Sequence, residues 1–200
     1  HALAFAGKKT SRALSSARRT LEILDTDQEV HDSPLAEPVE STSGEIVFAD
    51  VRFGYSPGVP VLEGVSFKAA PGETIGLVGR SGAGKTTLVN LVCRFYDVDE
   101  GSVLLDGRDI RQIKLRDLRK HIAVVPQDPY LFDSTIAQNI AYGRMNASLD
   151  DIVHAAIDAN AHDFIMRQPD AYDTIVGERG LRLSGGQRQL ISIARAILSD

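Results

Sequence analysis

The sequence is poor in cysteine, in basic charge and in long apolar runs. These shortages argue against an internal disulfide, a nucleic-acid partner and a membrane-spanning helix, respectively. The single cysteine, Cys93, cannot form an internal disulfide, so we expect a reducing compartment and a small buried thiol. With 22 basic against 27 acidic residues, the net charge of −5 does not favour nucleic acid as a partner. No segment approaches the roughly 20 apolar residues of a membrane-spanning helix. The chain starts at His1 without a signal-peptide pattern, from which we expect a processed or excised chain.

What is present is the composition of an ordinary globular protein, with enough apolar material for a substantial core. Residues 1–30 are predicted to form a helix, because leucines recur on one face while lysines and arginines crowd its first half. Residues 31–44, with Pro34, Pro38 and a polar run, are typical of a linker. Residues 45–200 are predicted to form one globular domain.

Within this domain, strands and helices follow one another in an α/β pattern. Strands are predicted around Ile46–Val51 and Val61–Phe67, at Thr74–Val78 (buried and parallel), at Ser102–Leu105 and at Ile122–Val125. Helices are predicted after residue 86, around Ile136–Ile140, over Leu149–Ala159 and after Ser184.

The most informative motif directly follows the predicted strand Thr74–Val78. The run GRSGAGKT matches G-x-x-x-x-G-K-[ST], a loop whose backbone N–H groups surround nucleotide phosphates at the start of a helix. Its lysine provides a mobile charge for the outer phosphates, and the threonine hydroxyl after it suits Mg²⁺. The alternative is a glycine-rich turn with a coincidental lysine. The predicted nucleotide-binding residues are Gly79, Arg80, Ser81, Gly82, Ala83, Gly84, Lys85, Thr86 and Thr87.

A second motif, LSGGQ, precedes the last predicted helix. Ser184 and Gln187 have the spacing of a capping box, which by itself indicates only a well-capped helix. Two glycines in the first turn cost about 1 kcal/mol each relative to alanine, so stability alone does not explain them. They would instead expose N–H groups to an anion beside the serine hydroxyl. The motif residues are Leu183, Ser184, Gly185, Gly186 and Gln187.

Together the two motifs resemble the nucleotide-binding domain of an ABC ATPase, over nearly the whole chain from Glu45 onward. The resemblance implies an α/β P-loop NTPase fold of the ABC type, with a helical extension from a membrane domain at the N-terminus. It implies ATP and Mg²⁺ as cofactors. Tyr55 stands where the family stacks an aromatic on adenine; the alternative is a strand tyrosine packed on the core. Gln127 matches the Q-loop glutamine, which with Thr86 would reach Mg²⁺.

Three segments resemble the multidrug-resistance-like exporter branch of this family: Arg94–Ile110, Pro129–Gly143 and Val176–Gly180, the last resembling its X-loop. Residues 1–30 resemble the cytosolic end of the last transmembrane helix; an independent N-terminal helix is the alternative. The resemblance implies a membrane protein with this part on its cytosolic face. The implied partners are transmembrane domains and a second nucleotide-binding domain, on which Leu183–Gln187 would act in trans.

The family's Walker B aspartate, catalytic glutamate and switch histidine do not occur in the sequence, so the chain alone is expected to be inactive and its domain incomplete. The intact protein is expected to couple ATP hydrolysis to export. Two alternatives stay open. One is a soluble ABC ATPase of DNA repair or chromosome architecture, although heptads and paired cysteines are missing. The other is a regulatory module that binds ATP without turnover.

Overall fold

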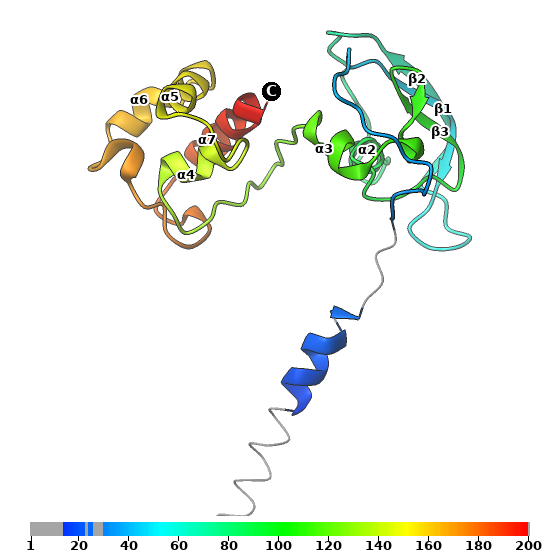
Figure 1. The fold of residues 1–200 in the computed structure, drawn as a ribbon, viewed down its shortest axis with the longest axis horizontal. Helices are drawn as coiled ribbons and strands as arrows, with labels where there is room; N and C mark the ends of the chain where they lie inside the picture. The colour runs from blue at the N-terminus through cyan, green and yellow to red at the C-terminus, as the bar shows by residue number, and fades with distance from the viewer. Residues whose placement is uncertain (1–13, 23, 26–29, 200) are drawn as a thin grey trace, which may run out of the picture.

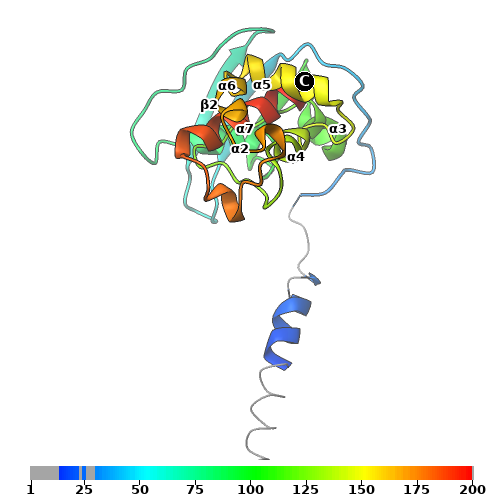
Figure 2. The same ribbon diagram turned by 90° about the vertical axis from the view of Figure 1, so that its left-hand side faces the viewer.

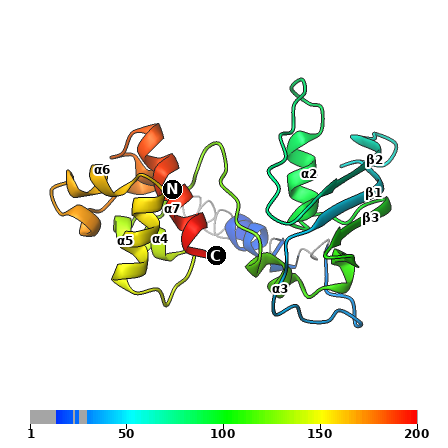
Figure 3. The same ribbon diagram turned by 90° about the horizontal axis from the view of Figure 1, so that it is seen from above.

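The computed structural model describes residues 14–22, 24–25 and 30–199. Figure 1 shows two bodies joined by an extended segment, residues 121–128. We call residues 30–120 the β lobe and residues 129–199 the helical lobe. Seen from above, the sheet and helix α2 belong to one lobe, and α4 to α7 belong to the other (Figure 3).

The β lobe is built on a four-stranded antiparallel sheet. Its strands are β1 (Ile46–Phe53), β2 (Leu62–Ala69), β3 (Glu100–Leu105) and β4 (Arg108–Asp109), in the order β2-β1-β3-β4. The strands predicted around Ile46–Val51 and Val61–Phe67 and at Ser102–Leu105 are therefore confirmed as β1, β2 and β3. Phe48 of β1 stacks on Phe67 of β2 with ring centroids 4.7 Å apart, which covers the apolar side of the sheet.

Helix α2 (Lys85–Val92) and helix α3 (Leu115–Lys120) complete the core of the β lobe. Leu91 and Leu118 are fully buried against the sheet residues, together with the short 3₁₀ helix η1 (Ile110–Gln112). Cys93, at the end of α2, is also buried, as predicted, and burial raises the pKa of its thiol.

Two predicted strands are wrong. Thr74–Val78 and Ile122–Val125 have no strand structure, and every residue from 71 to 80 is exposed, Val78 to 98%. Their apolar sequences have strand propensity, but a strand exists only when a neighbouring backbone accepts and donates its hydrogen bonds. Among the described residues, the sheet that forms contains only β1 to β4, and neither segment pairs with it.

The segment predicted as a linker is fastened to the β lobe, although it has no helix or ladder strand. Asp106 accepts hydrogen bonds from Thr42 and Ser43 at 2.7 Å and from the N–H of Glu45 at 2.9 Å. Burial raises the pKa of this carboxyl, but these hydrogen bonds outweigh that effect and hold the pKa well below its usual range. At the other end, the buried Arg94 donates to the carbonyl of His31 at 3.1 Å. Residues 31–44 thus lie fixed along this lobe.

The helical lobe contains four α-helices and two 3₁₀ helices among the described residues, and Figure 2 views it face on. They are α4 (Ile136–Ala141), α5 (Leu149–Asp158), α6 (His162–Met166), α7 (Gly185–Ser199), η2 (Ala171–Asp173) and η3 (Glu178–Gly180). The predictions of helices around Ile136–Ile140, over Leu149–Ala159 and after Ser184 are confirmed. Thr135 and Ser148 begin α4 and α5 with complete capping boxes.

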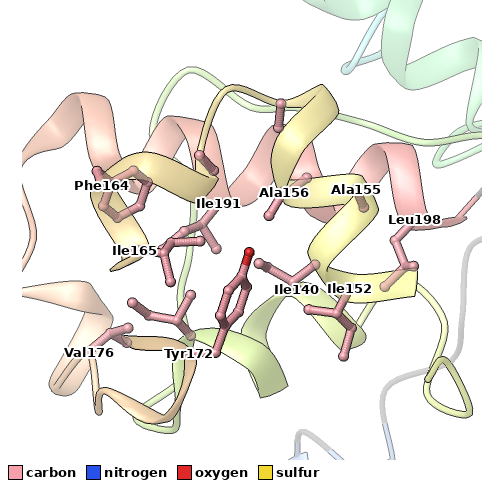
Figure 4. Close-up of a cluster of buried hydrophobic side chains, with 14 of the residues drawn as sticks. Ile140, Ile152, Ala155, Ala156, Phe164, Ile165, Tyr172, Val176, Ile191 and Leu198 are labelled. Atoms are coloured by element: carbon pink, nitrogen blue, oxygen red, sulfur yellow. The ribbon is translucent and has the colours of Figure 1, made fainter. Parts of the chain in front are cut away.

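The core of the helical lobe lies where these helices meet (Figure 4). Ile140, Ile165 and Ile191 are fully buried at its centre, one each from α4, α6 and α7. Tyr172 turns its hydroxyl inward, where it lies 2.9 Å from Nδ1 of His162. This separate core fixes the start of α7, which carries the LSGGQ motif.

Only part of the predicted N-terminal helix falls within the described residues. Residues 14–22 are helical, and Leu14, Leu21 and Leu24 of the predicted apolar face are exposed. Residues 1–13, 23 and 26–29 lie outside the described part. None of the described helices is both long enough and apolar enough to cross a bilayer.

Candidate nucleotide-binding site

The glycine-rich loop leads into α2, as its sequence predicts. Gly84 is the residue before the helix, with φ of 83°, and Gly82 has φ of 81°; both are left-handed conformations that glycine adopts without strain. Helix α2 has no side-chain cap. Its first-turn N–H groups therefore have neither an intrahelical acceptor nor a capping oxygen, and they suit an anion at this point.

Lys85 is the first residue of α2, and its ammonium group lies over the loop. Nζ donates to the carbonyls of Gly79 at 2.9 Å and Arg80 at 2.7 Å. The side chain is half-buried, and these two contacts keep the charge at the mouth of the loop. A phosphate bound to the loop would meet this charge directly, because the ammonium can rotate from carbonyl oxygens to phosphate oxygens.

Thr86, the residue after Lys85, has the side-chain chemistry of a Mg²⁺ ligand. The Thr86 hydroxyl is exposed at the start of α2, and a hard oxygen there fits Mg²⁺, which usually combines one or two protein ligands with phosphates and water. Gln127 is exposed in the segment between the lobes. No contact between the two side chains is formed. Among the described residues, no three His, Cys, Asp or Glu side chains cluster as metal ligands.

Tyr55 is tied to the same helix from the sheet side. Its hydroxyl donates to Oγ1 of the buried Thr87 at 3.1 Å and accepts from Nδ2 of Asn90 at 3.3 Å. The ring meets Phe53 and Tyr96 edge-on, at 5.0 and 5.1 Å between centroids, yet Tyr55 stays 49% exposed. About half of this side chain is therefore open to a ligand that could stack on it.

Two residues around Tyr55 were missed by reasoning from sequence. Asn90 and Tyr96 hold the tyrosine in place, and an open pocket of about 470 Å³ lies beside Tyr55 and Tyr96. Asn90 follows Thr87 by three residues, so helical spacing could have placed them on one face. No local pattern links Tyr96 to Tyr55, because 41 positions separate them in sequence (96 − 55).

The LSGGQ motif begins α7 with the predicted capping box. The N–H of Ser184 donates to Oε1 of Gln187 at 2.9 Å, and the N–H of Gln187 donates to Oγ of Ser184 at 3.2 Å. The serine hydroxyl accepts in this pair and keeps its own proton to donate. Leu183 is buried in the helical-lobe core, which anchors the motif from behind.

Neither glycine of this motif is required by the chain itself. Gly185 and Gly186 have no left-handed φ, and a Cβ would meet no atom within 4 Å at Gly186 and only the tip of Arg188, at 3.9 Å, at Gly185. Their N–H groups stand in the first turn, where a helix has no internal acceptor. The glycines therefore leave a flat, donor-rich surface open on the outside.

Fold and site together define a protein of the phosphate-loop nucleotide-binding class. A family model described as "ABC transporter" matches residues 62–200, and the chain belongs to this family. The domain of this family binds ATP, and its fold is that of an α/β P-loop ATPase. The resemblance carried by the two motifs is confirmed.

Named relatives are similar across most of the chain. An ATP-dependent lipid A-core flippase of Thiobacillus denitrificans is 52% identical over 94% of this chain and 33% of its own length. Human ATP-binding cassette sub-family B member 6 is 50% identical over 88% of this chain and 21% of its own length. The chain thus spans a third or less of these relatives.

A solved structure confirms the exporter type of the domain. A bacterial Atm1-family ABC exporter with ATP bound superposes with a TM-score of 0.87 at 43% identity, over 95% of this chain and 33% of that one. The identity is high enough for the likeness to reach beyond the general fold.

Proposed function

We propose that this chain is the ATP-binding part of an ABC exporter, in which ATP binding and hydrolysis drive transmembrane export. One observation carries the proposal: the chain holds a glycine-rich loop at Gly79–Thr87 before an uncapped helix, which is the phosphate cradle of the proposed complex, and a second donor surface at Gly185–Gly186 that its own fold does not use. The two lie in different lobes (Figure 1). The second surface is therefore suited to a nucleotide held by another molecule or domain.

In the proposed complex, ATP lies against the β lobe. Adenine stacks on the exposed face of Tyr55, and the phosphates accept from the N–H groups of the loop and the first turn of α2. Lys85 moves from its two carbonyl contacts to the outer phosphates. Thr86 and Gln127 provide oxygen ligands for Mg²⁺, which neutralises charge on the phosphates.

The LSGGQ motif acts on the nucleotide of a second nucleotide-binding domain. Ser184 donates its free hydroxyl proton, and Gly185 and Gly186 donate their N–H groups, to the γ-phosphate. Each ATP is then enclosed between two domains. When the two nucleotide-binding domains close on ATP, Gln127 and the exposed residues of Val176–Gly180 transmit this movement to the transmembrane domains. This chain lies on the cytosolic face.

The alternatives from sequence have less support. The relatives named above are a flippase and a sub-family B member, and the superposed structure is an exporter. None is a DNA-repair or chromosome protein, and the acidic net charge of −5 does not favour nucleic acid. The module without turnover is tested directly by ATP hydrolysis in the intact protein.

The test is Lys85→Ala in the intact protein, reconstituted in lipid. Losing a charged hydrogen-bond donor to phosphate should weaken MgATP binding about 10- to 100-fold and abolish hydrolysis. Calorimetry with MgATP and a phosphate-release assay measure the two effects. The matched control is Lys120→Ala, which removes an exposed lysine paired with Asp117 in the same lobe. Unchanged MgATP affinity in the Lys85 variant, or equal loss in the control, would contradict the assignment.

A further inference from the structure

A buried polar network in the helical lobe fastens the chain segment that follows Gln127. Asn139 of α4 is fully buried, and its side-chain oxygen accepts from the N–H of Phe132 at 2.9 Å. Its Nδ2 lies 3.0 Å from the carbonyl of Phe132, from Oγ of Ser134 and from the carbonyl of Thr135. One side chain thus fixes residues 132–135 against α4.

Arg195 of α7 joins the same network from the opposite side. Its Nε donates to the carbonyl of Asn139 at 2.8 Å, Nη2 to the side-chain oxygen of Asn139 at 3.2 Å, and Nη1 to the carbonyl of Tyr130 at 3.1 Å. Its guanidinium also lies 5.6 Å from the centre of the Tyr142 ring. A planar fork with several donors is needed to satisfy three acceptors in these directions.

Helix α7 is held to the same stretch of chain at a second point and approaches α4 closely. Gln189 donates to the carbonyl of Pro126, the residue before Gln127, at 3.3 Å. Gln189 and Arg195 lie six positions apart, about 9 Å along the helix. A Cβ at Gly143 would overlap the carbonyl oxygen of Arg195, so the backbone just after α4 contacts the backbone of α7 there.

We propose that Arg195 is a positioning residue that makes α7 and residues 126–135 a single mechanical unit. The LSGGQ motif begins this helix, and Gln127 lies within the held segment. A displacement of Gln127 is therefore passed to Ser184–Gln187 through the guanidinium rather than absorbed by the loop. This role rests on the proposed function, in which Gln127 reaches the Mg²⁺ of this chain's own ATP and Ser184–Gln187 reaches the γ-phosphate of the nucleotide on the second domain.

Arg195 lies outside the apolar core of the helical lobe, in which side chains such as Ile140, Ile165 and Ile191 are fully buried. Arg195 donates to the loop carbonyl of Tyr130 and to the backbone carbonyl and side chain of Asn139, which orders residues 132–135. A purely structural role predicts uniform loosening of the lobe, whereas a positioning role predicts loosening confined to residues 126–135.

The experiment uses Arg195→Lys and Arg195→Met in the intact protein. Lysine keeps the charge but not the fork, so both variants should expose the Phe132 N–H, raising its hydrogen exchange about 10-fold while α5 and α6 keep wild-type rates. Under the proposed function, kcat should also fall about 10-fold with MgATP affinity within twofold of wild type. Arg144→Met, which removes a half-exposed arginine paired with Asp151, is the control and should change neither.

The possible results separate the positioning role of Arg195 from its effect on catalysis. Wild-type exchange at Phe132 in both variants, or an equal rise across α5 and α6, overturns the positioning role. A local rise with unchanged kcat overturns the coupling. If the parent protein itself hydrolyses no ATP, the proposed function fails, whereas the mechanical unit is still judged by whether exchange rises at Phe132 while α5 and α6 keep wild-type rates.

Discussion

Helices α2 and α7 both begin with glycines in or next to their first turn, but the two helix starts are capped differently. Each begins a helix with N–H groups that have no internal acceptor. At α2 no side chain caps the turn, and Gly84 has a left-handed φ of 83°. At α7 Ser184 and Gln187 cap each other, and the two glycines that follow have ordinary conformations with open space around them.

The difference separates glycine required by the backbone from glycine required by something outside. The loop before α2 cannot take its shape without glycine, because Gly82 and Gly84 both have a left-handed φ. The start of α7 would form without glycine and would be more stable with alanine. A self-capped, flat surface of this kind suits a nucleotide that is bound to another domain, as in the proposed complex where each ATP is enclosed between two domains. Three substitutions test this contrast.

Gly84→Ala should have the largest effect on stability. A left-handed φ costs a residue with a Cβ about 1–2 kcal/mol, and the new Cβ would lie 2.6 Å from Cδ2 of the buried Leu62. We expect lower thermal stability of the intact protein and weaker MgATP binding by calorimetry. Gly58→Ala is the control, because Gly58 also has a left-handed φ, of 77°, but a Cβ there would meet no atom within 4 Å. Equal MgATP affinity in both variants would refute the role of Gly84 in the cradle.

Ser184→Ala should cost less stability. Removing a capping hydroxyl costs about 1 kcal/mol, so hydrogen exchange should rise in the first turn of α7. ATP turnover should fall further than this loss explains, because the donor to the γ-phosphate is also gone. Ser148→Ala removes the same kind of cap from α5, and it should loosen that helix with turnover intact. Equal turnover in the two variants would argue that Ser184 is only a cap.

Gly186→Ala should have the smallest effect on stability and the opposite sign. Alanine favours a helix over glycine by up to about 1 kcal/mol, and no atom lies within 4 Å of the added methyl. Hydrogen exchange in α7 should slow, yet ATP turnover should drop because the methyl obstructs the approaching phosphate. Asp158→Ala, at an exposed position near the end of α5, is a control that stabilises a helix away from the site. Full turnover in the Gly186 variant would contradict the proposal.

Both motifs could be identified from sequence because each is contiguous. The loop Gly79–Thr87 and the box Ser184–Gln187 depend on spacings of a few residues, and such spacings survive in any fold that contains the helix. The predicted capping box formed with both hydrogen bonds. The buried state of Cys93 followed equally well from its place on the apolar side of α2.

The failures and omissions all involve partners distant in sequence. Thr74–Val78 has the composition of a buried strand, but a strand needs another backbone beside it, and sequence does not say which. Tyr55 reaches Thr87, and Arg195 reaches Tyr130, across 32 and 65 positions. Residues 31–44 were predicted to be a linker because their prolines indicate irregular backbone. Prolines do not indicate whether such a backbone is hydrogen-bonded to the rest of the lobe.

Local sequence patterns were enough to identify a glycine-rich phosphate-loop motif, a second glycine-led helix start and membership of a family of ATP-binding domains. These depend on short-range geometry, since backbone torsions and helix periodicity are local properties. Tertiary structure alone decided which strands form, how much of Tyr55 is open and which side chain joins α7 to the segment after Gln127. Those outcomes depend on hydrogen bonds and packing between residues far apart in the chain, and such contacts exist only once the fold has brought them together.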